Sequence, residues 1–337
     1  MVKQLNRFWV YLIPISIISV SVIIGLSGLT AKHPELAIGI TYDLTLLSPL
    51  LYLLAIWKKD IPKITAIPFF ILGIIVSKLL LDHDEQAHLD IVITYFLPLV
   101  EIGVLIGVSV FVRRMSAAFK ESQTKQTDYY SMLQTACEKV IGKNRIAEIF
   151  ATEIGMISYA LFTWKRVLPT EQQFTQTKMS STIGLYVAVI MILLIESVPL
   201  HLLLHSWSPV LAWVITILSA YSLIQILGQM KSLSRRFHEL GEDYLIIRNG
   251  IFSEMHVPYE QIESVEVSEK DLDNFDFEIK KTGMLSKMEN HNIILRFNQE
   301  IVIRKFYGVR SKAKAIGIWV DEKQDFEAKL KEKQNLI

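Results

Sequence analysis

Long apolar runs alternate with short polar segments over the first two thirds of the chain, up to about Gly228. Six of these runs are long enough to cross a bilayer as helices, since about 20 residues span ~30 Å of hydrocarbon. They occupy residues 8–28, 37–57, 65–81, 91–112, 182–204 and 209–228. The first run follows Lys3 and Arg7, as in a signal peptide, but its apolar core is too long and no small-x-small cleavage site follows it. The pattern therefore predicts an α-helical polytopic membrane region of about six spans.

A further apolar segment, residues 146–164, is ambiguous because two glutamates interrupt it. Polar or small residues recur in it at helical spacing, at Glu148, Thr152, Gly155 and Tyr159, which is typical of a helix with one polar stripe. We interpret the segment as an interfacial or re-entrant helix. A seventh span is the alternative.

After Arg236 the pattern changes to short alternating runs. Two strand-like runs meet at Asn249 and Gly250, a dipeptide that strongly favours a β-hairpin. Two more meet at Asn298 and Gln299, which predicts a second hairpin. The segments IESVEVS and KAIGIWV add strands, and DEKQDFEAKLKEKQ predicts a closing amphipathic helix. Six or seven strands and a final helix in about 95 residues indicate a small β-barrel or sandwich.

These patterns divide the chain into four parts. We expect a four-span membrane region at 1–112 and a cytoplasmic helical insert at 113–181, which contains the helix at 146–164. The final two-span hairpin occupies 182–228, and the β domain occupies 238–337.

The distribution of Lys and Arg predicts the orientation of the spans. With the N-terminus inside, the inner segments 1–7, 58–64 and 113–181 hold 2, 3 and 10 of these residues, and KSLSRR after the last span adds 3. The outer segments contain Lys32 alone. The bias predicts a plasma (inner) membrane protein whose N-terminus and C-terminal domain are cytoplasmic, and it disfavours a seventh span.

The overall composition excludes several classes of function. A formal charge of +1 argues against nucleic-acid binding through long-range attraction. The single cysteine, Cys137, excludes an internal disulfide and a Cys-rich zinc or iron–sulfur site. The lipid bilayer and a protein contacting the C-terminal domain are the expected partners.

The run YLIIRNGIFSEMHVPYEQIESVEV resembles the entry of the bacterial pleckstrin-homology-like domain. The resemblance covers about residues 241–334 and rests on the hydrophobic spacing, the RNG turn and the VPYEQI strand start. It implies a seven-stranded barrel capped by a helix and does not specify a function. The membrane half resembles multi-pass bacterial membrane proteins with no activity to transfer.

Eukaryotic relatives of that fold often bind lipid headgroups, but the net charge of this domain argues against general binding of anionic lipid. From Glu239 onward the chain holds 19 Asp or Glu against 15 Lys or Arg, a net charge of −4, whereas a binder of anionic lipid should be basic. A local basic patch comprises Arg304, Lys305, Arg310, Lys312 and Lys314. It could face lipid phosphates or an acidic partner, but we favour a solvated hairpin and loop and a protein-contact or structural role for the domain.

Ionisable residues occur in four of the predicted spans or at their ends: Asp43, Lys78, Glu101 and Glu196. In the six-span topology all four share the outer half of the bilayer. Such groups are costly at that depth, so they are usually paired, hydrogen-bonded or functional. We therefore treat them as a candidate ligand or proton pocket, and predict that Glu196 points into the helix bundle.

Histidines near the outer ends of the spans suggest a second candidate site. His201 and His205 are four residues apart and share a helix face, whereas Glu196 lies on another face of a regular helix. With His83 from the loop DHDEQAH they could bind a divalent metal, because imidazole suits zinc, iron and manganese. The alternative, which we favour, is that they are interfacial residues. The cofactor therefore stays unknown.

No Walker loop, GxSxG, HExxH or Rossmann fingerprint is present, and HLLLH supplies one histidine box where membrane di-iron hydroxylases need several. We expect a non-enzymatic membrane protein with a sensing, scaffolding or envelope-associated role. The alternative is an intramembrane enzyme or an ion- or proton-coupled transporter that uses the Asp/Glu/His cluster.

Overall fold

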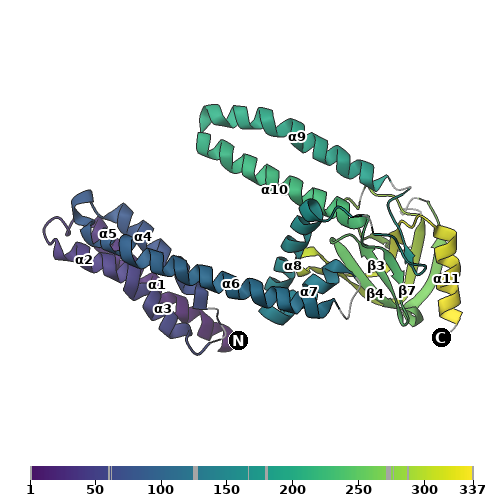
Figure 1. The fold of residues 1–337 in the computed structure, drawn as a ribbon, viewed down its shortest axis with the longest axis horizontal. Helices are drawn as coiled ribbons and strands as arrows, with labels where there is room; N and C mark the ends of the chain where they lie inside the picture. Colours follow the sequence, from purple (N-terminus) through teal and green to yellow (C-terminus); the bar gives the residue numbers. More distant parts are fainter. Residues whose placement is uncertain are drawn as a thin grey trace. The chain divides into compact units, whose positions relative to one another are not determined.

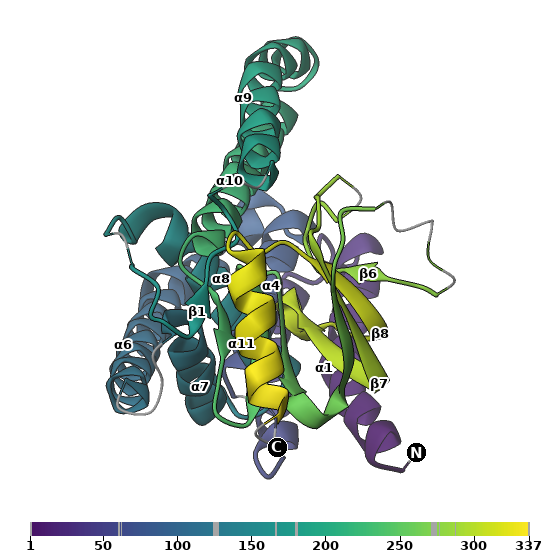
Figure 2. The same ribbon diagram turned by 90° about the vertical axis from the view of Figure 1, so that its right-hand side faces the viewer.

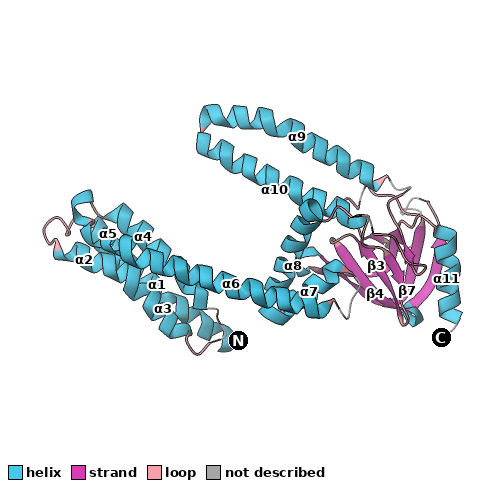
Figure 3. Ribbon diagram, in the orientation of Figure 1, coloured by secondary structure: helices cyan, strands magenta, loops and turns pink. Residues whose placement is uncertain are grey.

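A computed structural model describes residues 2–59, 61, 63–123, 128–165, 167–178, 181–270, 275, 277–286 and 288–335, with side chains from residue 10 onward. The chain forms two compact units, Met1–Val112 and Arg113–Ile337. Helices make up the first unit, and all the described strands belong to the second (Figure 3).

The first unit is built from apolar helices joined by short turns. They are α1 (Val2–Leu26), α2 (Glu35–Tyr42), α3 (Ser48–Ile56), α4 (Ile67–Leu80), α5 (Ala87–Ile91) and α6 (Leu97–Ser122), which continues into the second unit. The π-helical turns η1 (Asp43–Leu47) and η4 (Val92–Phe96) precede α3 and α6. Each turn comes just before a proline, Pro49 or Pro98, whose missing N–H interrupts regular α-helical bonding.

Close backbone contact holds part of this unit together. A Cβ at Gly73 of α4 would lie 2.1 Å from the carbonyl oxygen of Leu44 in η1, so only glycine permits this approach. Short 3₁₀ turns η2 (Lys63–Ala66) and η3 (His83–Glu85) flank α4.

In the part of the chain that the structure describes, five helical segments are long and apolar enough to cross a membrane. They are Glu35–Ile56, Lys63–Leu80, Ala87–Ser122, Thr182–Trp207 and Pro209–Leu233. They match five of the six predicted spans. The first predicted span corresponds to α1, whose described side chains, Val10–Leu26, form a shorter apolar helix. The segment at 146–164 is not among the five.

The described residues of the second unit form five further helices. They are α7 (Tyr129–Ile141), α8 (Arg145–Ile157), α9 (Thr182–Trp207), α10 (Pro209–Leu233) and α11 (Lys323–Asn335), and the π-helical turn η5 (Ser158–Phe162) extends α8. Capping side chains start three of them: Asp128 accepts from Ser131 N–H, Asn144 from Ala147 N–H and Ser208 from Leu211 N–H. Ser208 separates α9 from α10, which form an antiparallel hairpin (Figure 1).

The described residues of the second unit include eight strands, which form one mixed sheet. They are β1 (Gln173–Phe174), β2 (His238–Leu240), β3 (Tyr244–Asn249), β4 (Ser253–Pro258), β5 (Ile262–Val267), β6 (Lys280–Lys281), β7 (Ile293–Lys305) and β8 (Arg310–Ile318). The order is β1-β2-β3-β4-β7-β8-β6, with β5 on β7; β6 and β8 are parallel and the other pairs antiparallel. The sheet is open because its two-residue end strands, β1 and β6, do not pair with each other. The β domain and its final helix are therefore as predicted in outline, but the described strands do not close the predicted barrel or sandwich.

The two predicted hairpins had different outcomes. β3 and β4 pair across Asn249 and Ser253, and Gly250 has a positive φ of 51°, which confirms the first hairpin. The second is wrong, because β7 runs continuously through residues 298 and 299. The pairing of β7 with β8 shifts register between Arg296 and Ile301, so this polar segment is an irregularity within one strand.

The final helix covers one face of the sheet (Figure 2). Phe326 and Leu330 of α11 are fully buried in the apolar core of the domain, as their spacing predicted. The Phe326 ring meets Phe174 of β1 edge-on, with 5.1 Å between ring centroids. The insert and the C-terminal segment therefore share one core.

Candidate functional site at the junction of the last hairpin and the sheet

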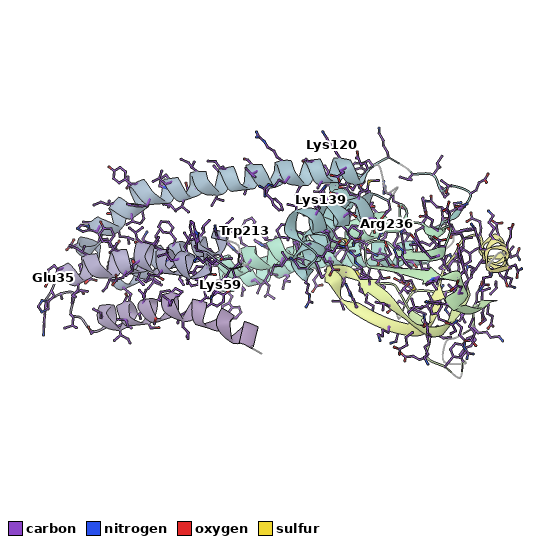
Figure 4. All side chains as sticks on the ribbon, turned by 90° about the horizontal axis from the view of Figure 1, so that it is seen from below. Glu35, Lys59, Lys120, Lys139, Trp213 and Arg236 are labelled. Atoms are coloured by element: carbon purple, nitrogen blue, oxygen red, sulfur yellow. The ribbon has the colours of Figure 1, made fainter. Side chains whose placement is uncertain are left out.

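Arg236 lies at the centre of the junction between α10 and the sheet. Its side chain is 0% exposed, and it is labelled where the helices of the second unit meet the strands (Figure 4). The guanidinium donates to Asp128 at 2.8–3.1 Å, to Glu254, and to the carbonyl oxygen of Gly250 at 2.5 Å. It also lies 4.7 Å from the ring centroid of Tyr130.

Arg248 extends this buried ionic network. Its guanidinium lies 2.8 Å from Glu239 and 3.5 Å from Glu254. Burial alone would raise the pKa of the Glu254 and Asp128 carboxyls, but the charge of Arg236 holds both pKa values below their usual range. The network is therefore ionised, and loss of one partner would leave a buried charge uncompensated.

Two side chains of α10 bind the turn between β3 and β4. The Gln229 Oε1 atom accepts from the backbone N–H groups of Ile251 and Phe252 at 3.1 Å, and its Nε2 donates to Asn249 O at 3.1 Å. Ser232 Oγ accepts from Ile251 N–H at 3.0 Å. We call Gln229 and Ser232 of α10, together with Arg236 three residues after its end, the α10 clamp. It joins the end of a candidate membrane span directly to the sheet.

The segment α8–η5 packs against the same part of α10. A Cβ at Gly228 would lie 2.3 Å from the carbonyl oxygen of Met156, so the two helices touch through their backbones. Lys231 Nζ donates to Ala160 O at 2.9 Å. Arg235 donates to Thr163 O at 2.7 Å. Helices α8 and α10 and the β3–β4 turn thus form one packed junction.

Glu153 of α8 binds three polar side chains at this junction. It accepts from Tyr221 at 2.7 and 2.8 Å, from Gln225 at 2.8 Å and from Tyr307 at 2.5 Å. Tyr307 stands in the β7–β8 turn with φ of 56°, a strained conformation for a non-glycine residue. Burial and the neighbouring carboxylate raise the pKa of the Tyr307 phenol, which keeps it protonated as a donor.

The predicted outer-half pocket is divided between the two units. Asp43 begins the π-helical turn η1 and is half-buried, while Lys78 on α4 and Glu101 on α6 are exposed. All three belong to the first unit, whereas Glu196 is an exposed residue of α9 in the second. The grouping of these four residues therefore stays a prediction, and so does the inward orientation of Glu196.

The predicted histidines are also divided. His201 and His205 share a face of α9, as their spacing predicted, with nearly parallel rings 5.8 Å apart. His201 Nδ1 is 2.6 Å from Thr216 Oγ1, so its ring is already hydrogen-bonded. His83 is exposed in η3 of the first unit. Among the described residues no group of three or more His, Cys, Asp or Glu is arranged to hold a metal, and the metal role stays a prediction.

The predicted basic patch lies on β7, β8 and the turn between them. Arg304 Nε is 3.7 Å from Glu148, and Lys312 Nζ is 3.4 Å from Glu300. Lys305 is half-buried, and Arg310 and Lys314 are exposed. Two of the five cations therefore have carboxylate partners within the unit, and lipid or acidic-partner binding stays a prediction.

Sequence patterns missed the Arg236 network. Arg236 belongs to the KSLSRR segment, which entered the prediction of orientation only through its positive charge, and its carboxylate partners, Asp128 and Glu254, lie 108 and 18 residues away. Three members of the polar stripe, Thr152, Gly155 and Tyr159, are buried against the protein. Gly155 was the sequence signal of this close packing, because a Cβ at that position would lie 2.8 Å from the Tyr130 ring.

Comparisons of the chain with protein-family profiles, with curated proteins and with solved structures find no match.

Proposed function

We propose that this protein is a multi-pass protein of the plasma (inner) membrane that acts as a sensor or scaffold through a cytoplasmic interaction domain. The observation that carries the proposal is the α10 clamp. Gln229 and Ser232 lie in a candidate span, and their hydrogen bonds to Ile251 and Phe252 attach the sheet to it. A domain bonded to a span in this way keeps a fixed orientation at the membrane surface. Movement of the hairpin would then be transmitted to the sheet.

The charge pattern supports the cytoplasmic location of the sheet. The short inner segments are rich in Lys and Arg, and Lys32 is the single such residue in the outer segments. The same distribution of Lys and Arg supports a cytoplasmic N-terminus and a cytoplasmic C-terminal domain.

The β3–β4 hairpin and the closing helix α11 support a pleckstrin-homology-like type for the domain. The open sheet and the contribution of β1 by the insert are departures from the barrel that the resemblance implies. A net charge of −4 from Glu239 onward favours a protein partner over anionic lipid or nucleic acid as the ligand of this domain.

An intramembrane transporter or enzyme is the second candidate, and Asp43 is the observation that favours it. Asp43 opens a π-helical turn inside a candidate span. Such turns often occur at functional sites, and an ionisable residue inside a span suggests a proton or ion site.

Complementation separates the two candidates. In a strain whose growth depends on the protein, the variants Asp43→Asn, Glu101→Gln and Glu196→Gln should each restore growth if the protein is a scaffold. Gln229→Leu should fail to restore growth, because it removes the bonds to the β3–β4 turn. Immunoblotting of membranes ensures that the variants are compared at equal abundance. Failure of the carboxylate variants combined with growth of Gln229→Leu would favour transport or catalysis and contradict the proposal.

A further inference from the structure

One face of α8–η5 is apolar and exposed, while the opposite face is buried. The exposed residues recur at helical spacing and continue into the segment that follows: Ile146, Ile149, Phe150, Ile157, Leu161, Phe162 and Trp164. We call them the α8 apolar face. The opposite side of the helix packs on Tyr130, Leu133 and Ile251. A contiguous apolar surface of this kind marks an interaction site in a stable fold.

The α8 apolar face adjoins the surface of a candidate span. Its helix lies across the C-terminal part of α10 (Figure 1), with Glu153 bonded to Tyr221 and the Ala160 carbonyl bonded to Lys231. The contacts thus cover α10 from Tyr221 to Lys231, where the apolar run of this span gives way to the basic KSLSRR segment. If α10 crosses the bilayer, α8 lies at the depth where hydrocarbon meets the headgroups.

The end of the α8 apolar face has the composition of a membrane interface. Trp164 is 74% exposed, and the Lys231 ammonium lies 3.7 Å from the centroid of its ring. Lys165 follows and is exposed. Tryptophan concentrates at membrane interfaces, and lysine extends its charge from an apolar surface toward water and lipid phosphates.

The carboxylate of Glu153 does not prevent contact with lipid. Glu153 stands in the middle of this face, between Phe150 and Ile157 along the helix. Its oxygens accept hydrogen bonds from Tyr221, Gln225 and Tyr307. These donors replace water, so the carboxylate can lie near hydrocarbon at a reduced desolvation cost.

We propose that the α8 apolar face is a membrane-binding surface, with α8–η5 lying in the inner leaflet beside α10. The inference rests on the proposed membrane insertion of α9 and α10. Its consequence is that the sheet is fixed to the membrane at two points, through the α10 clamp and through lipid contact along α8. An amphipathic helix in this position typically inserts about 5–10 Å into the boundary between headgroups and acyl chains.

Spin-label accessibility in the full-length protein tests the inference. Cys137 is replaced by Ala, and single cysteines are labelled at Ile149, Ile157 or Phe162 in phosphatidylcholine–phosphatidylglycerol vesicles. Leu194, exposed on α9, provides the control for a hairpin in lipid. Glu332, exposed on α11, provides the control for water. Collision rates with oxygen, which concentrates in lipid, are compared with those of a water-soluble nickel chelate.

We expect the oxygen-to-nickel ratio at the three α8 positions to exceed the ratio at Glu332 several-fold. Nickel-accessible labels at these positions, with Leu194 still in lipid, would overturn the inference and leave the proposed function intact. Low rates with both reagents would show that protein covers the face, for example a second copy of the chain, and would also overturn it. A nickel-accessible label at Leu194 would instead contradict the proposed membrane function.

Discussion

His238 is buried in β2 with both ring nitrogens hydrogen-bonded. Nε2 lies 3.2 Å from Trp319 O, and Nδ1 accepts from Arg248 N–H at 3.3 Å. These partners assign the neutral tautomer with its proton on Nε2. A second proton on Nδ1 would have no hydrogen-bond acceptor, because Nδ1 faces the N–H donor of Arg248. Burial and the nearby Arg248 charge lower the pKa of His238 to about 4.

We predict that His238 makes the second unit sensitive to mild acid. In the unfolded chain a histidine binds a proton at a pKa of about 6.5. The contribution of neutral His238 to the free energy of unfolding is therefore fully present above about pH 6.5 and is lost as the pH falls toward 4. The loss amounts to roughly 3 kcal/mol at most. Thermal unfolding of the full-length protein in detergent, measured between pH 7 and 4, should show a falling midpoint.

The variant His238→Gln should flatten this pH dependence, because it removes the titrating group. His83→Gln is the matched control, since His83 is exposed and its loss should not change the slope. If the unfolding midpoint falls equally with pH in the unmodified protein and in both variants, the acid sensitivity belongs to other groups.

At the residue scale, the sequence predicted contacts within one helix better than contacts between residues far apart in the chain. Its spacing placed Phe326 and Leu330 in a core and His201 beside His205, because one helix determines each of these pairs. It could not identify Asp128 as the partner of Arg236, since that contact depends on how α7 and α10 pack. A buried ion pair between distant residues leaves no periodic signal.

Gly228 shows how the packing of two elements can depend on one missing side chain. Gly228→Ala places a Cβ 2.3 Å from Met156 O, so α8 must move away from α10. We predict a destabilisation of about 1–3 kcal/mol, measured as a lower unfolding midpoint of the full-length protein in detergent.

Gly184→Ala on α9 is the matched control, because no atom lies within 4 Å of the added Cβ. Alanine favours a helix over glycine by roughly 1 kcal/mol, so this variant should be unchanged or slightly more stable. Equal effects of the two substitutions would show that the α8–α10 contact does not limit stability.

At the element scale, hydrophobic runs predicted the long helices closely, because a span needs a minimum apolar length. Short strands were harder to predict. The polar residues Asn298 and Gln299 indicated a turn, but both flanking segments pair with β8 and form one strand with a register shift. β1 contains two residues and lies before the final hairpin, so its pairing with β2 depends on tertiary structure.

At the scale of the whole molecule, the second unit links a candidate membrane hairpin to a sheet without a flexible linker. Four residues separate the end of α10 at Leu233 from the start of β2 at His238, and Arg236, one of the four, is buried. The insert adds β1 to the sheet and packs α8 and η5 against the hairpin. It therefore forms a second connection between the hairpin and the sheet, in addition to the α10 clamp. A sensor needs such stiffness to transmit a change in the hairpin, and a scaffold needs it to present a surface in one orientation.

The distance distribution between α10 and the sheet tests this coupling most directly. In the Cys137→Ala background, spin labels replace Leu218 on α10 and Val302 on β7, which are both exposed. Pulsed electron spin resonance of the full-length protein in vesicles should give one narrow distance distribution. Gln229→Leu should broaden it, while Ser222→Leu, an exposed position two helical turns earlier, should leave it narrow because the α10 clamp and the α8 contacts are intact. A broad distribution in the protein with both glutamines present would show that the sheet moves independently of the hairpin, and would contradict the account.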